Sequence, residues 1–311
     1  MKISFIATVL NEEGNIEKFF ASILNQSKLP DEIIIADAGS KDQTLELLTK
    51  LQKTSKIKNF KIIQKKGNRS VGRNEAIKRA TGDVILCSDS GCVLDKKWIE
   101  NIMEPFKDKT VDVVAGYYEG KPRSIFEKCL IPYVLVMPDK VNKETFLPAA
   151  RSMALRKSVW KKIGGFNEKL SHNEDYDFAI RLKKNGTQII FNKKAIVFWI
   201  PRDNLFDSFK MFFRFAYGDG QSGIIRPKVI LIFIRYFIVC FLIILYLVLQ
   251  QYFIINILLC LLPLYILWSI TKNYRYVKHI GAFIFLPVLQ ITSDIAVILG
   301  TTFGLVNMIH G

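Results

Sequence analysis

The stretch KRATGDVILCSDSGCVLD, residues 78–95, contains the end of a helix, a buried strand and a lone acidic residue. Gly82 ends the helical pattern, and the apolar run Val84–Leu86 predicts a strand with both faces buried. Asp89 follows this strand, among small polar residues. Such residues favour a turn, so Asp89 has a plain interpretation as a turn residue. The alternative is a metal or phosphate site, and the rest of the sequence decides between the two.

The same alternation of strand and helix extends toward the N-terminus. The segments KISFIATVL, DEIIIADAGS and FKIIQKK predict three more strands, and amphipathic segments separate them. This order predicts a doubly wound, mostly parallel α/β sheet, in which ligands bind beyond the carboxyl ends of the strands. Three polar segments fall at those ends: Thr8–Glu12, Asp37–Ser40 and Ser88–Gly91.

The pattern is less regular after residue 95. VDVVAGYY predicts a strand, RSIFEKCLIPYVLVM is ambiguous, and FLPAARSMALRK is extended and then helical from about Arg156. NEDYDFAIRLKKNG predicts a helix with acids in its first turn and lysines in its last turn, ended by Gly186. TQIIFNKKAIVFWI predicts one or two strands. Together these segments complete a cytosolic domain over residues 1–200.

Three long apolar runs occupy the C-terminal region, residues 229–311. Each has about the 20 residues that a membrane span requires, at residues 229–249, 252–270 and 281–306. The alternative is a set of very apolar core helices. The third run is the least regular because it contains Pro287 and Asp294. Asp294 and Arg235 lie inside spans, where they would pair or face a polar cavity, and the sequence assigns them no role.

An amphipathic segment, residues 201–228, precedes the first span. One helical face of DNLFDSFKMFFRFAYGDG carries most of its apolar residues, which are Leu205, Phe206, Phe209, Phe212, Phe213 and Ala216. Such a helix beside a span is expected to lie in the membrane interface. A buried core helix is the alternative.

The charge of the chain predicts its partners and its orientation. The formal net charge is +16, which favours anionic partners such as a membrane surface, a nucleotide or a lipid diphosphate. We expect no nucleic acid, because the sequence has no nucleic-acid motif. Lys and Arg flank the first span and follow the second, at Arg226, Lys228, Lys272, Arg275 and Lys278. By the positive-inside rule these flanks are cytoplasmic, so three spans would place the C-terminus outside.

Five motifs together resemble those of a known family. TVLNEEGNI, ADAGSKDQT, RNEAIKRATGDVILCSDSG, WKKIGGFNEKL and NEDYDFAIRLKKNG occur in the order and spacing of inverting family-two glycosyltransferases of GT-A fold. The resemblance covers about residues 2–199. FFRFAYGDGQSG also resembles a stretch before the spans of transferases in bacterial exopolysaccharide assembly. The resemblance implies a membrane-anchored enzyme that moves a sugar from a nucleotide-sugar, with a UDP-sugar expected first, to a lipid-linked or glycan acceptor.

Within this resemblance, Asp89 matches a metal-binding acid. A leaving diphosphate needs countercharge, usually Mg²⁺ or Mn²⁺ held by carboxylate oxygens and by the phosphates. This chain departs from the family pattern, with Cys87 at the usual first acid and Ser90 after Asp89. A site with one protein carboxylate relies more on diphosphate and water, so strict metal dependence stays open.

The resemblance also implies donor-binding residues. Asp37 matches an acid that contacts the nucleotide, and Thr8 and Glu12 match positions near the base and ribose. Arg69 and Arg73 are placed to meet the diphosphate. Each has a plainer alternative: an Asx-turn for Asp37, a helix N-terminus for Glu12, and a solvated face for the two arginines.

Asp175 and Glu174 match the Glu-Asp pair that carries out catalysis in the family. A carboxylate at Asp175 would accept the proton of the attacking hydroxyl, in a single displacement with inversion. Glu174 would orient the acceptor or its loop, and Arg214 would meet a lipid diphosphate. The alternative is that both acids only favour a helix N-terminus.

Two other functions stay open. One is a processive synthase that extrudes polymer through its spans. Such enzymes carry a Gln-x-x-Arg-Trp element where this chain has FAYGDGQSG. The other is a catalytically silent binding or scaffold protein, which the thinned acid cluster suggests. Product length tests the first, and donor hydrolysis or sugar transfer excludes the second.

Overall fold

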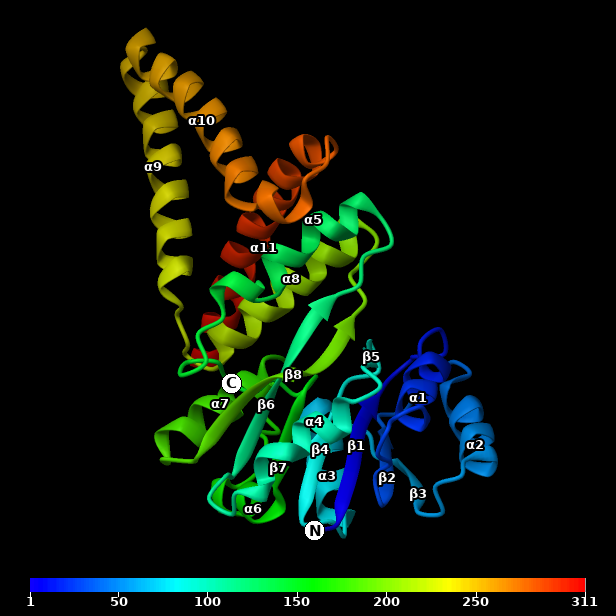
Figure 1. Ribbon diagram of the computed structural model, residues 1–311. Helices are drawn as coiled ribbons and strands as arrows, with labels where there is room; N and C mark the ends of the chain where they lie inside the picture. The colour runs from blue at the N-terminus through cyan, green and yellow to red at the C-terminus, as the bar shows by residue number, and fades with distance from the viewer. Residues whose placement is uncertain (311) are drawn as a thin grey trace. The chain divides into compact units, whose positions relative to one another are not determined.

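The computed structural model describes residues 1–310 and contains two compact units (Figure 1). The first unit comprises Met1–Lys121 and Val136–Ile200, and the second comprises Pro122–Leu135 and the chain from Pro201 onward. The second unit therefore takes one segment, residues 122–135, from within the first 200 residues. Sequence patterns do not show this exchange, because the segment is bracketed by strands of the first unit.

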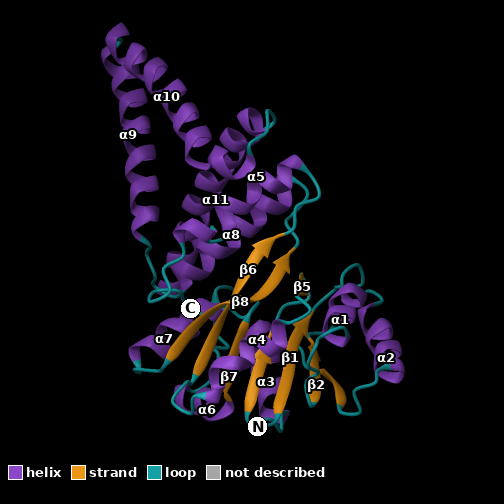
Figure 2. Ribbon diagram, in the orientation of Figure 1, coloured by secondary structure: helices purple, strands orange, loops and turns teal. Residues whose placement is uncertain are grey.

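The first unit is an α/β sheet with helices on both faces (Figure 2). Its strands are β1 Ile3–Val9, β2 Glu32–Asp37, β3 Phe60–Gln64, β4 Val84–Cys87, β5 Cys92–Leu94, β6 Val113–Gly120, β7 Met153–Arg156 and β8 Ile189–Trp199. Its α-helices are α1 Ile16–Leu24, α2 Thr44–Thr54, α3 Arg69–Arg79, α4 Trp98–Met103, α6 Lys157–Ile163 and α7 Glu174–Lys184, with short 3₁₀ turns at Glu104–Lys107 and Pro138–Lys140.

The strands form one eight-stranded sheet in the order β3-β2-β1-β4-β7-β6-β8-β5. The strands β1 to β4 pair in parallel, as the alternating pattern predicted, and β6 pairs in parallel with β8. Strand β7 runs antiparallel between β4 and β6, and β5 runs antiparallel to β8. The mostly parallel α/β sheet expected from the sequence is confirmed, and the antiparallel insertion of β7 is a feature that the sequence did not predict.

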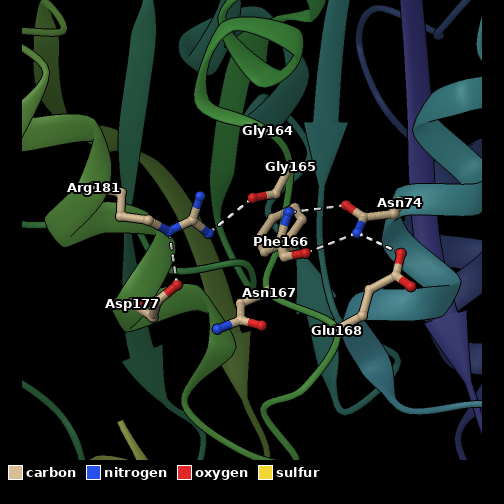
Figure 3. Close-up of a pocket in the computed structure, with 8 residues that line it drawn as sticks. All are labelled: Asn74, Gly164, Gly165, Phe166, Asn167, Glu168, Asp177 and Arg181. Carbon is tan, nitrogen blue, oxygen red and sulfur yellow. Dashed lines mark hydrogen bonds and ion pairs between the residues drawn. The ribbon is translucent and has the colours of Figure 1, made fainter. Parts of the chain in front are cut away.

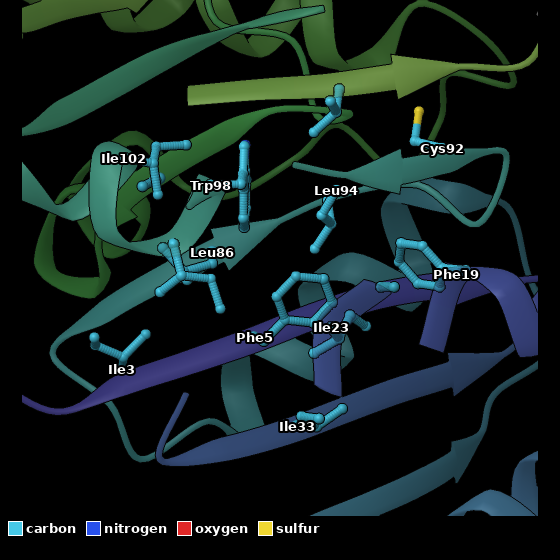
Figure 4. Close-up of a cluster of buried hydrophobic side chains, with 14 of the residues drawn as sticks. Ile3, Phe5, Phe19, Ile23, Ile33, Leu86, Cys92, Leu94, Trp98 and Ile102 are labelled. Carbon is cyan, nitrogen blue, oxygen red and sulfur yellow. The ribbon is translucent and has the colours of Figure 1, made fainter. Parts of the chain in front are cut away.

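Alternate residues of the central strands enter two different hydrophobic cores. Phe5 and Leu86 belong to the core under α1, α2 and α4, which Figure 4 shows around Trp98. Their neighbours Ile6 and Ile85 belong to the core under α3, α6 and α7. Successive side chains of a strand point to opposite faces, so strands that are apolar throughout require cover on both sides.

Strand register brings polar residues from distant segments to one edge of the sheet. Val9 pairs with Asp37, so β1 and β2 end at the same level, and β4 ends at Cys87, whose partner Ile6 lies three residues before the end of β1. Met153 of β7 also pairs with Cys87, and β7 runs the opposite way. The residues just before β7 therefore lie at the same edge as the residues just after β4.

Over its described residues, up to residue 310, the second unit has five helices: α5 Ile125–Val134, α8 Leu205–Gln221, α9 Pro227–Leu249, α10 Tyr252–Val277 and α11 Ala282–His310. Three of them, α9, α10 and α11, are long and apolar enough to cross a membrane, by length and composition. The apolar runs of the sequence are thus helices. The ambiguous stretch after residue 122 is also a helix, α5, and it packs on α10 and α11.

Helices α8 and α11 pack side by side at backbone distance. A Cβ atom added at Gly300 would lie 2.4 Å from the carbonyl oxygen of Phe213, and one at Gly304 would lie 2.3 Å from that of Tyr217. These two glycines form a Gly-x-x-x-Gly pair on α11, a spacing that lets two helix backbones approach closely. Gly220 of α8 makes the same approach from the other side, with Cβ 2.8 Å from the carbonyl oxygen of Thr301.

The close contact between α8 and α11 predicts that a single added methyl group at Gly304 lowers the stability of the protein. Gly304→Ala adds a methyl group against the rigid backbone of α8, so the helices must move apart. We expect a loss of about 1–3 kcal/mol in the free energy of unfolding, as for other overpacked sites. The measurement is a denaturation titration in mixed micelles. Thr302→Ala, at an exposed position of the same helix, is the matched control and should change stability little. Equal stability of the two variants would contradict the packing.

Candidate active site

A single arginine joins the two halves of the candidate site. Arg73 lies in α3, and its side chain is only 4% exposed. Its Nη2 donates to Oδ1 of Asp89 at 2.9 Å, and its Nη1 donates to Oε1 of Glu174. Its guanidinium also lies over the ring of Phe166, 5.5 Å from the centroid. Carboxylates from two distant segments are therefore held on one buried cation.

The start of α3 is fixed so that Arg73 reaches the edge of the sheet. The side chain of Asn68 caps the helix by accepting from the backbone N–H of Val71 at 3.1 Å. A Cβ added at Gly72 would lie 2.7 Å from Cγ2 of Thr8, so only glycine lets the helix lie this close to β1. Thr8, a predicted donor contact, thus also forms the surface on which α3 rests.

The segment GGFNE, residues 164–168, holds the loop before α7 against α3. Asn74 accepts from the backbone N–H of Phe166 at 2.9 Å, and its amide donates to Oε1 of Glu168 at 2.8 Å (Figure 3). Gly164 and Gly165 have φ of 80° and 74°, which favours glycine. The segment borders an open hollow of about 420 Å³ that none of the predicted site residues lines. Its contribution is to position α7, and with it Glu174.

Asp175 follows Glu174 as the second residue of α7 and is partly exposed. Its Oδ2 accepts from the backbone N–H of Ala150 at 3.2 Å, and its Oδ1 accepts from that of Tyr176 at 2.9 Å. Burial and the neighbouring Glu174 carboxylate raise the pKa of Asp175 above its ordinary value, although Arg73 and Arg151 act in the opposite direction. A raised pKa brings the carboxyl nearer to the range in which a general base works well.

Arg151 is a site residue that the sequence analysis missed. It precedes β7, and its backbone carbonyl accepts from the hydroxyl of Ser88 at 2.8 Å. Its guanidinium lies over the ring of Tyr118, 5.1 Å from the centroid. Within the described residues its Nη1 is buried without a hydrogen-bond partner. The only signal in the sequence was a basic residue before a strand, and its importance depends on the antiparallel pairing of β7 with β4.

Asp89, the acid that follows β4 in the stretch at residues 78–95, lies among arginine side chains. Burial acts to raise the pKa of Asp89, but Arg73, Arg69 and Arg151 outweigh it, so the pKa lies below its ordinary value. Its side chain is 39% exposed, which leaves the carboxylate open to a ligand. Cys87, at the usual first acid of the family, is buried, and burial raises its thiol pKa to about 12. A neutral buried thiol packs in the core and does not replace an acid as a metal ligand.

The fit of a metal ion rests on Asp89 alone. Across the part of the chain that the structure describes, His, Cys, Asp and Glu do not gather in threes in a way that would hold a metal ion. Asp89 supplies one carboxylate, whose Oδ1 already accepts from Arg73. A divalent cation at this residue would take its other ligands from the diphosphate and water.

The other predicted donor residues lie at the ends of β1 and β2. Asp37 is buried, and its carboxylate accepts from the backbone N–H groups of Gly39 and Ser40 in an Asx-turn. Glu12 accepts from the side chain of Asn15 at 3.0 Å. Both side chains therefore stabilise the loops that border the site. Donor contacts by these residues stay a prediction.

The two remaining predicted residues, Arg69 and Arg214, are both exposed but belong to different units of the chain. Arg69 is exposed at the start of α3, near enough to lower the pKa of Asp89. Arg214 is exposed on α8, which belongs to the second unit. Its predicted contact with an acceptor diphosphate stays a prediction.

Comparison with known families decides the class of this sheet and site. The model described as "Glycosyl transferase family 2" matches residues 4–162, and the one described as "Glycosyl transferase family group 2" matches residues 84–292. The chain belongs to glycosyl transferase family 2. The segments matched include Arg73, Asp89 and the membrane-type helices α9 and α10. This protein is therefore a glycosyltransferase of GT-A fold, as its motifs suggested.

Curated relatives of this glycosyltransferase are named as glycosyltransferases or as a polysaccharide synthase. The chain is 26% identical over 235 residues to the poly(ribitol-phosphate) beta-glucosyltransferase of Bacillus spizizenii, covering 66% of this chain and 35% of that enzyme. It is 26% identical over 209 residues to the O-antigen chain rhamnosyltransferase RfbN of Salmonella typhimurium, covering 63% and 66%. A poly-beta-1,6-N-acetyl-D-glucosamine synthase of Staphylococcus aureus is 25% identical over 234 residues, covering 72% and 56%. The chain thus spans about a third to two thirds of these relatives.

Solved structures share the fold of this glycosyltransferase. A mannosyltransferase from Pyrobaculum calidifontis, in complex with GDP-Man and Mn²⁺, aligns with a TM-score of 0.55 at 17% identity, covering 70% of this chain and 62% of that one. TarS of S. aureus in complex with UDP aligns with a TM-score of 0.50 at 24% identity, covering 70% and 64%. At these identities the likeness establishes the fold.

The raised pKa of Asp175 predicts a pH dependence of sugar transfer, and this dependence distinguishes Asp175 from the acidic residues near it. A base must be deprotonated, so sugar transfer should fall as pH falls through the raised pKa. Glu174→Gln removes a negative charge beside Asp175, which lowers that pKa. The acid limb of kcat/KM should therefore move to lower pH in a pH–rate profile. Asp177→Asn, in the same helical turn but paired with Arg181, is the control and should leave the limb in place. An unmoved limb in Glu174→Gln would contradict the assignment.

Proposed function

We propose that this glycosyltransferase moves a sugar from a nucleotide-sugar to a lipid-linked or glycan acceptor at the cytoplasmic face of a membrane. The observation that carries the proposal is the bridge of Arg73 between Asp89 and Glu174. This bridge brings an acid suited to a diphosphate beside the acid pair suited to the acceptor. The two ends of one displacement reaction thus have their groups at one edge of the sheet.

The donor is assigned to the ends of β1, β2 and β4. The mannosyltransferase neighbour was solved with GDP-Man and Mn²⁺ and TarS with UDP, which supports a nucleotide-sugar with a divalent cation. A UDP-sugar with Mg²⁺ or Mn²⁺ is the first pair to test. The bound cation supplies positive charge to the leaving diphosphate. Asp89 would hold the cation, and Arg69 and the Nη1 of Arg151, which has no hydrogen-bond partner among the described residues, would add countercharge from the protein.

The reaction is a single displacement at the anomeric carbon. The carboxylate of Asp175 accepts the proton of the acceptor hydroxyl, and the hydroxyl oxygen bonds to the anomeric carbon. The bond from that carbon to the diphosphate oxygen breaks, and the nucleoside diphosphate leaves with the electron pair. Glu174 stays paired with Arg73 and keeps the start of α7 in place. Attack opposite the leaving group inverts the anomeric configuration.

The C-terminal helices anchor this reaction at the membrane. Arg226 and Lys228 flank the start of α9, and Lys272, Arg275 and Lys278 lie at the end of α10, whereas the turn between the helices is uncharged. This charge distribution supports a cytoplasmic site. An integral membrane enzyme in the cell membrane then receives its donor from the cytosol, with Arg214 near the acceptor lipid.

A processive synthase is the second candidate. The Staphylococcus relative is named as a polymer synthase, which favours this activity. The segment FAYGDGQSG occupies the place of the Gln-x-x-Arg-Trp element of such enzymes, which favours single transfer. Electrophoresis of the products decides, because a synthase produces a ladder and a single transferase produces one band.

Two amide variants test the separate roles proposed for Asp89 and Asp175. Asp89→Asn keeps the acceptor for Arg73 but removes the charge that holds the cation, so it should weaken donor binding in the presence of metal. Asp175→Asn removes the proton acceptor and leaves the donor region intact. Donor affinity should then stay unchanged, while transfer falls by a factor on the order of 10²–10⁴. Calorimetric donor titration and a transfer assay are run on both variants.

The control and the donor screen use the same preparations. Asp177→Asn should match the unmodified protein in both measurements. Near-normal transfer by Asp175→Asn would refute the base, and normal donor and metal binding by Asp89→Asn would reduce this residue to a turn acid. A panel of nucleotide-sugars, with and without Mn²⁺, identifies the donor by the rise in unfolding temperature that a specific ligand produces.

A further inference from the structure

The contacts of α11 conflict with a membrane topology of three spans. Helices α9, α10 and α11 all have the length and composition of spans. Their burial differs, however: none of the most apolar window of α9 is buried, compared with 17% for α10 and 39% for α11. Helix α11 is thus the one of the three that protein surrounds most.

The far end of α11 lies beside the start of α9. A Cβ added at Gly223 would lie 3.2 Å from the sulfur of Met308, and Nε2 of Gln221 donates to Oδ1 of Asn307 at 3.2 Å. Helix α9 begins at Pro227, four residues after Gly223. Four residues reach at most about 14 Å, well short of the hydrocarbon core of about 30 Å. The end of α11 and the start of α9 must therefore lie on the same side of the membrane.

Chain order places the start of α11 on that side too. If α9 and α10 both cross, the end of α10 returns to the side where α9 began. The connection from Val277 to Ala282 is as short as the one before α9, so α11 begins there as well. Both ends of α11 then lie on one side, although the helix is roughly 43 Å long at 1.5 Å for each of its 29 residues.

The length and charge of α8 exclude the alternative that α8 and α11 cross the membrane together. Helix α8 has 17 residues, about 25 Å, and carries Asp207, Lys210, Arg214 and Asp219. Four charges on a helix shorter than the hydrocarbon core make a span unfavourable. Because α8 packs on Gly300 and Gly304, the C-terminal half of α11 lies at the depth of α8.

We propose that only α9 and α10 cross the membrane, and that α11 lies with α8 in the leaflet on the side where α9 begins. The partner of its outer face is lipid acyl chain. One stripe along this face is exposed and apolar, formed by Ile284, Val288, Ile291, Ile295, Leu299, Phe303 and Val306. These residues recur every three or four positions, so they form a continuous surface that water would solvate poorly.

A buried polar cluster ties α11 to both spans. Asp294 is fully buried, and its Oδ2 accepts from Arg235 of α9 at 2.6 Å and from the hydroxyl of Tyr265 of α10 at 2.7 Å. Gln290 of α11 donates to its Oδ1 at 2.9 Å. Arg235 lies in the N-terminal half of α9, nearer the side where that helix begins. The cluster therefore holds α11 against the half of the α9–α10 hairpin that lies nearer the side where α9 begins. The two-span topology places α11 on this side.

Single cysteines test the topology in the full chain in its native membrane. The background replaces the two exposed cysteines, Cys240 and Cys260, by serine. Probe cysteines replace Gln251 in the turn after α9, Ile280 in the turn before α11, and Ile309 at the end of α11, all exposed positions. An impermeant maleimide is applied to intact cells and again after permeabilisation, which confirms that each probe is reactive.

The pattern of labelling decides between topologies. We expect Gln251→Cys to react in intact cells, and Ile280→Cys and Ile309→Cys to react only after permeabilisation. Reaction of Gln251→Cys and Ile309→Cys together in intact cells means three spans and overturns the proposal. Reaction of Ile280→Cys and Ile309→Cys, with Gln251→Cys protected, supports two spans but refutes the cytoplasmic site of the proposed function.

A second measurement tests the lipid partner. A fluorophore on Phe303→Cys, in protein reconstituted into vesicles, should be quenched by lipids brominated in their acyl chains. A fluorophore on Gln251→Cys, outside the core, is the control and should be quenched much less. Absence of quenching at Phe303→Cys would show that α11 is covered by water or protein, and would overturn the assignment of lipid as the partner.

Discussion

The interaction of Arg73 with Asp89 and Glu174 is the constraint on which the site depends. The three residues come from α3, the end of β4 and the start of α7, and neither Arg73 nor Glu174 is exposed by more than 4%. Breaking a buried pair leaves an uncompensated charge, which typically costs about 3–5 kcal/mol. The sheet edge therefore tolerates few alternative arrangements. Arg73 also acts to lower the pKa of a third carboxyl, Asp175, but burial and the Glu174 carboxylate outweigh it, so that pKa stays raised.

The proposed site combines a single candidate metal-binding acid, Asp89, with several arginines. Where the family pattern has further acids, this chain has Cys87 and Ser90, and Cys87 is a buried thiol whose pKa is raised. Arg69, Arg73 and Arg151 surround Asp89, and one nitrogen of Arg151 is buried without a partner within the described residues. Guanidinium groups match phosphate oxygens in geometry and stay charged at every relevant pH. In the proposed reaction, the protein thus supplies part of the countercharge for the leaving diphosphate.

The helical unit is organised by close approach as much as by hydrophobicity. Gly300 and Gly304 let α8 and α11 touch along their backbones, and Asp294 gathers polar groups from α9, α10 and α11. Both features reduce the surface of α11 that lipid can contact. Length and hydropathy alone rank α11 with the spans, whereas its contacts with α8 support the position that we propose for it. In that proposal, the spanning helices and α11 take different positions although their sequences are similar.

The sequence by itself determined the alternating strands and helices of the N-terminal half, the family motifs and the apolar C-terminal helices. These depend on local periodicity and on residue types at short spacing, which a sequence shows directly. It did not determine the antiparallel place of β7, the role of Arg151 or the bridge from Arg73 to Glu174, 101 residues apart. Nor did it show that α5 joins the C-terminal helices, or that α11 packs along α8. Only the tertiary structure decided these features, because each is a contact between segments whose separation along the chain carries no periodic signal.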